Sequence, residues 1–463
     1  MKTSSFVQQT NKHFIRAALL VARIRASTRT RAVNARAMFA THARARLTPR
    51  ARPDASARAR SRDPTRRRRH RNHAVVARAT ENTPNDATRT RRDVLRDAAI
   101  ASTLLATAGA SAFARPLAAV AEEAVENAAP KTPCVLITGA NSGVGYTAAK
   151  QIAAQGTRTV VVACRSVEKS ERAVRELKRD VGEDAKVISL PVGLELTDLR
   201  SVREYALAFL DRQSDLALDA LVLNAGIMAA PLERTAQGHE LHFGINHLGH
   251  FLLADALTPM LRETRGRVVS VSSLLSMIGD FALDLDDLDW NKREYDPWYA
   301  YGASKAQNVL FADEYARREG KNGIVANSLH PGIVTTNLVR YSVPDLVQSK
   351  RDLAKERESF AGKLAAKAGI RNPDEGARTS VWLATSDEAA RQTGKFFIDP
   401  GLEYPGATRE QLVEAGDWFL SSGTEFLAPQ LHFPERLFEW RTSVNAAKLW
   451  TTSQEMVDEF VIR

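Results

Sequence analysis

The chain has 463 residues, enough for two or three domains of about 100–200 residues, and its 44% apolar and 26% charged residues argue against global disorder. Residues 1–114 hold 25 of the 65 Lys and Arg residues and 6 of the 54 Asp and Glu residues, so they carry +19 and the remainder carries −8. The net charge of +11 is therefore no sign that the folded part binds nucleic acid.

Residues 1–80 have the composition of an organellar transit peptide. They are rich in Arg, Ala, Ser and Thr, and their only acids are Asp54 and Asp63. Such an acid-poor segment, which shows no sustained apolar period, is typical of a targeting sequence. The alternative is a disordered basic tail that contacts nucleic acid.

Residues 81–114 have the order of a second, secretory signal. Arg91 and Arg92 precede an Ala-rich apolar stretch, residues 98–114, which ends in small residues suited to cleavage. The pair resembles a twin-arginine signal, although Val94 stands where that motif usually has Phe. Together the two segments resemble the presequence of a thylakoid-lumen protein, so we expect a chloroplast location in the lumen, with the stroma or the membrane surface as alternatives.

Residues 115–132 form a linker, and from residue 133 short apolar runs alternate with helical patterns. The expected strands are residues 134–138, 159–164, 187–190, 220–223, 267–271, 324–329 and 395–398. The expected helices include residues 144–155, 167–181, 198–211 and 300–318. Buried strands separated by helices indicate a parallel sheet covered on both faces. The sequence thus predicts one α/β domain over residues 133–400, with a Rossmann-type doubly wound sheet of about seven strands.

Three segments interrupt this alternation. Residues 280–298 are acidic and contain Pro297, so we expect a loop. Residues 341–369 read as a charged helical insert. Residues 401–463 form a C-terminal extension, with aromatic and Pro residues to 441 and a helix over 444–460. We expect the insert and the extension to shape a substrate pocket, and the rest of the mature chain to contain no membrane span.

The two cysteines carry no expected chemistry. Two are too few for a disulfide framework or a four-cysteine zinc site. Cys134 begins the first strand and Cys164 ends the second, so in neighbouring parallel strands they lie too far apart for a disulfide. We expect both to be core residues and no metal site.

A glycine-rich turn joins the first strand to the first helix. Glycine there permits a tight turn and a close approach to phosphate, and the helix N-terminus offers free N–H groups. The spacing of the glycines alone is a weak signal, and the strand before it and the helix after it supply the context. The residues expected to bind a cofactor here are Gly139, Asn141, Ser142, Gly143, Val144 and Gly145.

The end of the second strand selects the cofactor. NAD sites place a carboxylate there for the ribose hydroxyl, whereas NADP sites place an arginine for the 2′-phosphate. No acid lies between Val160 and Val167, and Arg165 follows the strand. Arg165 therefore favours NADP(H), with a solvated surface arginine as the alternative.

Later strand ends carry further polar or small residues. Residues 224–226, Asn224, Ala225 and Gly226, can pass against the cofactor. Asn246 opens an apolar helix, where a helix cap is the alternative role. Ser273 follows the fifth strand and can bond a substrate oxygen or cap a turn. After the sixth strand, Pro331, Gly332 and Thr336 are expected near the nicotinamide.

Tyr301 and Lys305 are four residues apart on one helix face. A fixed ammonium favours the phenolate, so we expect Lys305 to lower the pKa of Tyr301 from its usual value near 10. Such a phenol can act as acid and base for a carbonyl and alcohol pair. An exposed helical pair is the alternative.

Taken in this order, the motifs resemble the short-chain dehydrogenase/reductase superfamily, in its retinol-dehydrogenase-like branch, which includes a chloroplast translocon-associated relative. The resemblance runs from about residue 132 to 398 and implies that Tyr301 is the acid/base. It also implies that Lys305 holds the nicotinamide ribose, Ser273 orients the carbonyl, and Asn246 anchors a water. Glu195 stands where the family has an Asp that contacts adenine.

Protochlorophyllide reductases are plastid relatives that this chain also resembles. They carry a Cys two residues after the catalytic Lys, where this chain has Gln307, and they lack the serine that stands here as Ser273. Both departures argue against that activity.

Two functions remain open at this point. The first is an NADP(H)-dependent enzyme that interconverts a lipophilic carbonyl and its alcohol. The second is a non-catalytic NADP-binding regulator of a plastid membrane complex. The expected partner is a small molecule and no nucleic acid, while membrane contact and homo-oligomerisation stay open.

Overall fold

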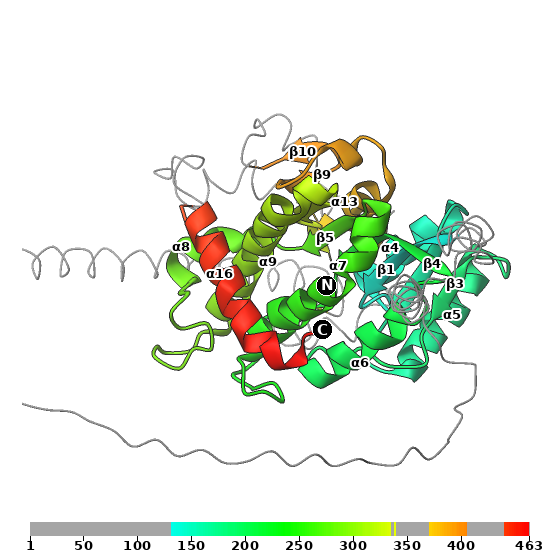
Figure 1. Ribbon diagram of the computed structural model, residues 1–463. Helices are drawn as coiled ribbons and strands as arrows, with labels where there is room; N and C mark the ends of the chain where they lie inside the picture. The colour runs from blue at the N-terminus through cyan, green and yellow to red at the C-terminus, as the bar shows by residue number, and fades with distance from the viewer. Residues whose placement is uncertain (1–130, 335–337, 339–369, 405–438, 463) are drawn as a thin grey trace, which may run out of the picture. The chain divides into compact units, whose positions relative to one another are not determined.

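An eight-stranded sheet forms the centre of the described structure, a computed structural model that describes residues 131–334, 338, 370–404 and 439–462 (Figure 1). The strand order is β10-β9-β6-β5-β4-β1-β2-β3, and every neighbouring pair is parallel except β9 and β10. Their bounds are β1 Thr132–Thr138, β2 Thr159–Ala163, β3 Val187–Ser189, β4 Leu216–Leu223, β5 Arg267–Val271, β6 Val325–Leu329, β9 Phe396–Asp399 and β10 Leu402–Glu403. The predicted doubly wound fold is confirmed, with β10 as a short antiparallel strand beyond the seven expected.

Two helical layers cover the sheet, and each layer closes its own apolar core. One layer packs on the face of β1 that carries Cys134 and Leu136, and contains α6 Leu199–Leu210, α7 Gly249–Thr264, α9 Pro297–Glu319 and α16 Ser443–Val457. The other contains α4 Gly143–Ala154, α5 Val167–Val181 and α13 Pro373–Thr385. Leu136 faces the first core and Ile137 the second, as the two-residue period of a strand requires.

Shorter elements complete the described chain. The helical ones are η1 Phe243–Leu248, η2 Leu274–Ile278, α8 Gly279–Ala282, η3 Gly320–Asn322, η6 Ala389–Arg391 and η7 Asp458–Phe460. A separate two-stranded parallel sheet pairs β7 Ile333–Val334 with β8 Ile370–Arg371. Within the described residues, no helix has both the length and the apolar character needed to span a membrane.

The register of the first two strands separates the cysteines. Cys134 pairs with Thr159 at the start of β2, and Thr138 pairs with Ala163 at its end. Cys164 lies beyond that end, so the two thiols are at opposite ends of the ladder. Both cysteines are buried and free, as predicted.

The expected loop over residues 280–298 is only partly correct. Residues 279–282 form α8, and α9 begins at Pro297 rather than at residue 300. Asp296 caps the helix by accepting hydrogen bonds from the backbone N–H groups of Trp298 and Tyr299, at 2.8 and 2.9 Å. Proline fits the first helical position because its missing N–H would have no partner there.

Helix α16 packs on the outer side of α9. The Trp450 ring lies parallel to that of Phe311, at 6.0 Å between centroids, and edge-on to Phe251, at 4.9 Å. The Arg318 guanidinium covers the Trp450 ring. The predicted helix over residues 444–460 is therefore present, and its aromatic face completes the core around α9.

Several expectations fall outside the described residues. They are the transit and signal segments within residues 1–114, most of the linker at 115–132, the insert at 341–369, and residues 405–438 of the extension. These stay predictions.

Candidate active site

The glycine-rich turn places α4 against the end of β4. Gly139 has a positive φ of 68°, a conformation that glycine adopts without strain. A Cβ on Gly145 would lie 2.3 Å from Asn224 Nδ2, so a side chain cannot fit there. The turn therefore needs glycine at both positions, as its sequence predicted.

The N-terminus of α4 is left open to an anion. Its first residues include no acid, and the Ser142 side chain at the N-cap makes no capping hydrogen bond. In contrast, α5, α6, α9, α13 and α16 are all capped by side chains, namely Ser166, Asp198, Asp296, Asn372 and Thr442. The free N–H groups and positive dipole end of α4 thus fit the pyrophosphate of a dinucleotide, and they are contributed by Gly143, Val144 and Gly145.

Residues 224–226 connect this turn to Lys305, a residue of α9. Asn224 donates from Nδ2 to the Thr138 carbonyl at 2.8 Å, and the N–H groups of Asn224 and Ala225 both donate to Thr138 Oγ1 at 2.9 Å. A Cβ on Gly226 would lie 3.0 Å from Asn246 Oδ1 and 3.6 Å from Lys305 Nζ. Gly226 therefore stands between the cofactor turn and the catalytic groups.

Tyr301 and Lys305 occupy the buried side of α9, with exposed fractions of 3% and 4%. Lys305 donates from Nζ to the Val271 carbonyl at 2.9 Å, at the end of β5. Its Nζ lies 5.7 Å from the centre of the Tyr301 ring. The exposed-pair alternative is therefore wrong.

Burial sets the protonation of this pair. Burial raises the pKa of Tyr301 to about 12, although a hydrogen bond with Ser273 lowers it. The same burial lowers the pKa of the Lys305 ammonium to about 7. The expected fall in the Tyr301 pKa is thus not found, because desolvation disfavours the charged form of both groups. At neutral pH the phenol holds its proton.

Ser273 is the N-cap residue of η2 and lies two residues after the end of β5. Its Oγ accepts from the Leu275 N–H at 3.2 Å, so it does cap this turn. The capping role of Ser273 is therefore confirmed, and its hydrogen bond to a substrate oxygen stays a prediction.

Asn246 lies inside η1, a π-helix, and is not a helix cap. Its Nδ2 donates to the Ile227 carbonyl at 3.1 Å and to Ser304 Oγ at 2.9 Å, and its Oδ1 accepts from the Ile227 N–H at 2.9 Å. The Asn246 carbonyl lies 3.3 Å from His250 Nδ1. The π-helix is typical of functional sites and explains why Asn246 reaches across to α9.

Arg165 and Glu195 form an ion pair at the carboxyl edge of β2 and β3. Arg165 Nε lies 2.9 Å from Glu195 Oε2, with side-chain exposures of 54% and 30%. Glu195 Oε1 also accepts from the Thr197 N–H at 3.1 Å. The two residues assigned to the adenosine end are therefore brought together, and Arg165 is not an isolated surface arginine.

The loop after β6 lies against Arg371. Gly332 has a φ of +89°, and a Cβ there would lie 2.3 Å from Arg371 Cδ. His330, next to Pro331, accepts at Nδ1 from the Leu274 N–H at 3.3 Å, and burial lowers its pKa to about 3. Thr336 lies outside the described residues, so its role stays a prediction.

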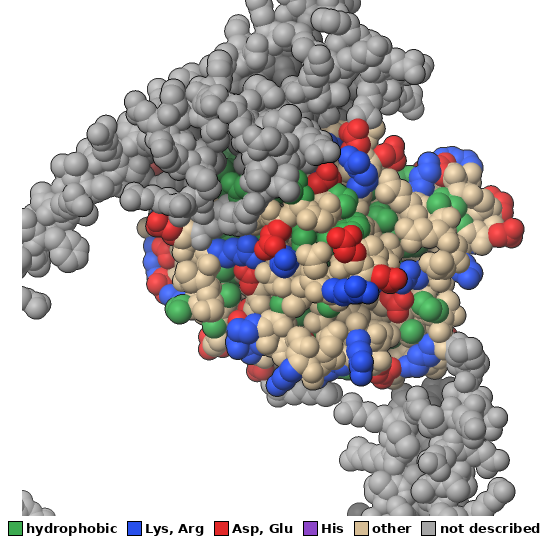
Figure 2. Space-filling model, turned by 90° about the horizontal axis from the view of Figure 1, so that it is seen from above, with side chains coloured by type: hydrophobic (Ala, Val, Ile, Leu, Met, Phe, Trp, Pro, Cys, Tyr) green, Lys and Arg blue, Asp and Glu red, His purple; other side chains and the backbone are tan. Residues whose placement is uncertain are grey.

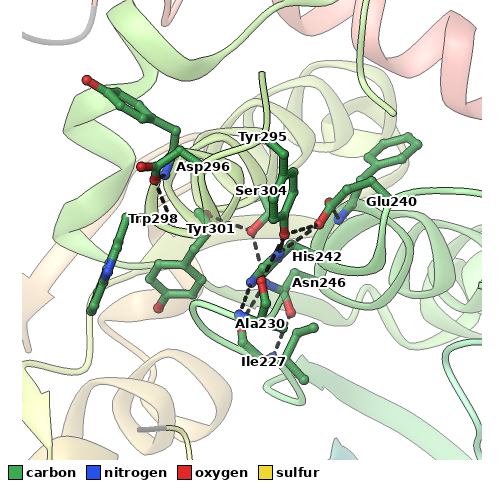
Figure 3. A network of polar contacts seen from close by, with 12 residues as sticks. Ile227, Ala230, Glu240, His242, Asn246, Tyr295, Asp296, Trp298, Tyr301 and Ser304 are labelled. Atoms are coloured by element: carbon green, nitrogen blue, oxygen red, sulfur yellow. Dashed lines mark hydrogen bonds and ion pairs between the residues drawn. The ribbon is translucent and has the colours of Figure 1, made fainter. Parts of the chain in front are cut away.

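A buried polar network beside Tyr301 was missed by the sequence analysis (Figure 3). It joins Glu240, His242 and Tyr295, and the His242 and Tyr301 rings lie edge to face at 6.2 Å. Glu240 and His242 are 1% and 0% exposed. The signal available was an acid and a histidine at alternate positions just before the apolar run that contains Asn246.

Charges on the outer surface are mixed. Figure 2 shows Lys and Arg side chains interspersed with Asp and Glu over the described part of one face, without a continuous basic surface there. Among the described residues, no group of three His, Cys, Asp or Glu side chains could hold a metal ion.

Comparisons with known proteins agree with this geometry. The family model described as short chain dehydrogenase matches residues 133–283. The chain is 39% identical over 277 residues to human retinol dehydrogenase 14, and the matched region covers 57% of this chain and 77% of that protein. It is 35% identical over 291 residues to human retinol dehydrogenase 11, covering 62% and 84%. Among solved structures, L-sorbose reductase from Gluconobacter frateurii, complexed with NADPH and L-sorbose, covers 61% of this chain and 100% of that chain, with 21% identity and a TM-score of 0.43.

Proposed function

The chain belongs to the short-chain dehydrogenase family, and from this premise we propose that it is an NADP(H)-dependent oxidoreductase that interconverts a lipophilic carbonyl compound and its alcohol. Two observations carry the proposal: Tyr301, Lys305, Ser273 and Asn246 are all buried, with Lys305 and Asn246 beside Gly226, and the N-terminus of α4 is uncapped. A protein that only senses the cofactor needs the second feature and not the first.

The uncapped N-terminus of α4 and Arg165 support the proposed binding of NADP(H). The N–H groups at the start of α4 would hold the pyrophosphate, and the Arg165 guanidinium, which pairs with Glu195 in this structure, would hold the 2′-phosphate. Lys305, whose Nζ lies beside Gly226 and bonds to the Val271 carbonyl, would hold the nicotinamide ribose. When bound, NADPH supplies the hydride that reduces the carbonyl carbon.

The raised pKa of Tyr301 supports its proposed role as the proton donor. A phenol with a pKa of about 12 is protonated at neutral pH, which is the form that gives a proton to a carbonyl oxygen. Ser273 donates a second hydrogen bond to the same oxygen and so fixes its position. In the reverse direction the phenolate is required, so alcohol oxidation should rise with pH through the alkaline range.

The lipophilic substrate class rests on the relatives. Proteins named retinol dehydrogenases match this chain at 33–39% identity over at least 74% of their own lengths. A retinoid-sized apolar aldehyde is therefore the first substrate to test. The chloroplast location, with the lumen before the stroma, is proposed from residues 1–114 alone.

The test is a panel of aldehydes and ketones, beginning with all-trans-retinal, in which NADPH oxidation is followed by its absorbance. The wild-type protein should turn over at least one apolar carbonyl, and the Tyr301→Phe variant should bind NADPH without turnover. If purified protein binds NADPH and reduces no member of the panel, the non-catalytic regulator is the better proposal.

A further inference from the structure

We propose that Glu240, His242 and Tyr295 form a positioning network that sets the place of Tyr301 and Asn246 in the active site. The inference rests on the proposed function, since it assigns these residues to the same reaction. Figure 3 shows the three side chains meeting beside Tyr301 and Asn246.

Hydrogen bonds link the three side chains, and the single proton of the Tyr295 hydroxyl has two acceptors within reach, Glu240 Oε1 and the Ala230 carbonyl. Glu240 Oε1 lies 2.7 Å from His242 Nδ1 and 3.1 Å from the Tyr295 hydroxyl. Glu240 Oε2 accepts from the Phe243 N–H at 2.8 Å. The Tyr295 hydroxyl also lies 3.0 Å from the Ala230 carbonyl.

These bonds fix the tautomer of His242. The Ala230 N–H donates to His242 Nε2 at 3.1 Å, so Nε2 carries no proton. The proton of the neutral ring is then on Nδ1, where it is donated to Glu240. His242 has no lone pair left for substrate, so its role is to hold other groups in place.

The network joins three segments that carry the catalytic groups. Ala230 follows β4, His242 directly precedes η1, and Tyr295 directly precedes the Asp296 cap of α9. Tyr301 lies in the second turn of α9, so a shift at Tyr295 moves its phenol. The contact of the His242 and Tyr301 rings adds a direct restraint.

A second set of bonds passes from the same segments to Asn246. Its side chain bridges Ile227 and Ser304, and Ser304 Oγ donates to the Tyr301 carbonyl at 2.7 Å. The phenol of Tyr301 and the amide of Asn246 are therefore held in one frame.

The burial of Glu240 indicates that the network orients active-site groups and does not only stabilise the fold. Burial of a carboxylate is costly, and apolar residues of similar volume are often as stabilising. Here three neutral donors satisfy the carboxylate in a site that an apolar side chain could fill. Hydrogen bonds fix the orientation of the side chains that they join, which apolar packing does less strictly. Orientation matters for catalysis because a displacement of a reacting group by about 1 Å can lower the rate ~100-fold.

The experiment compares two substitutions that each remove one phenolic hydroxyl. Tyr295→Phe breaks the network, whereas Tyr315→Phe removes a buried hydroxyl that lies 2.6 Å from Thr258 Oγ1, near the far end of α9. Both variants are measured for kcat with the carbonyl substrate, for the dissociation constant of NADPH, and for thermal stability. Glu240→Gln serves as a second network variant, because its amide cannot accept all three donors.

We expect Tyr295→Phe and Glu240→Gln to lower kcat by ~10-fold or more while the NADPH dissociation constant changes less than twofold. Tyr315→Phe should lower stability and leave kcat within twofold of wild type. If Tyr295→Phe keeps wild-type kcat, or loses no more than Tyr315→Phe, the network is structural only and the inference is wrong. If Tyr301→Phe itself keeps its turnover, the proposed function fails, and the positioning role fails with it.

Discussion

Replacing Lys305 by methionine should make the protein more stable, and on the proposed mechanism it should abolish activity. Methionine has a similar length and no charge, so Lys305→Met removes a buried ammonium without leaving a large cavity. In the folded chain burial lowers the pKa of Lys305 from 10.5 to about 7. The unfolded state therefore binds this proton more tightly than the folded state does.

The sign and size of the effect follow from this difference. Each pKa unit corresponds to 1.36 kcal/mol, so the lysine reduces the free energy of unfolding by ~4–5 kcal/mol near pH 7. This reduction in the free energy of unfolding is fully present below pH 7, near the pKa of Lys305 in the folded chain. It falls to ~2 kcal/mol at pH 9 and disappears above 10.5, the pKa of Lys305 in the unfolded chain. Loss of the bond to the Val271 carbonyl offsets ~1–2 kcal/mol, and Asn308 Nδ2, at 3.4 Å from that oxygen, replaces part of it. The net gain should be ~3 kcal/mol at pH 7 and near zero at pH 9.

The assay is urea unfolding of the cofactor-free wild type and variant at pH 7, 8 and 9. Comparison of the two proteins at each pH cancels the titration of all other groups. Lys448→Met, which removes an exposed lysine paired with Asp286 at 2.6 Å, is the matched control and should show no pH-dependent gain. A Lys305→Met protein that is less stable than wild type at pH 7, or a difference that does not shrink by pH 9, would refute the burial argument.

Three further predictions concern the cofactor, the proton and the N-terminus. Arg165→Asp should weaken NADPH binding by ~10-fold or more and improve NADH binding, measured by fluorescence titration, because it exchanges a phosphate partner for a ribose partner; equal NADPH affinity in both proteins contradicts this. Tyr301→Phe should lower turnover by ~10²–10⁴-fold with NADPH affinity retained, and unchanged turnover would remove the phenol from the mechanism. The mature N-terminus should lie near residues 112–115 and depend on Arg91 and Arg92, and native mass spectrometry that detects residues 81–110 would show otherwise.

The regular elements could be predicted because their signals are local. The expected helix over residues 167–181 and strand over 267–271 coincide with α5 and β5. Strand β4 begins at Leu216, four residues before the expected start. The earlier start was missed because Asp219, which pairs with Arg158, interrupts the apolar run in the sequence. The start of α9 was missed for a similar reason, since Pro297 is read as a helix breaker unless the Asp296 cap is recognised.

The site could be predicted as a set of residues but not in its electrostatics. Type and spacing pointed to Tyr301, Lys305 and Ser273, the family resemblance pointed to Asn246, and the structure buries all four. The direction of the Tyr301 pKa was wrong, because spacing shows the attraction of a nearby ammonium and burial depends on the whole fold. The Glu240 network was missed for the same reason: its partners Ala230 and Tyr295 come from distant segments that only folding brings together.

The cover that α16 places over α9 has a consequence for biosynthesis. Helix α16 begins more than a hundred residues after α9 ends, and translation at about 5–20 residues per second delays it by roughly 6–25 s. During that interval Phe251 and Phe311 lack Trp450, so a nascent chain exposes the aromatic face of the very helix that carries Tyr301. We therefore expect the growing chain to expose an apolar surface, to which chaperones can bind, until α16 has emerged.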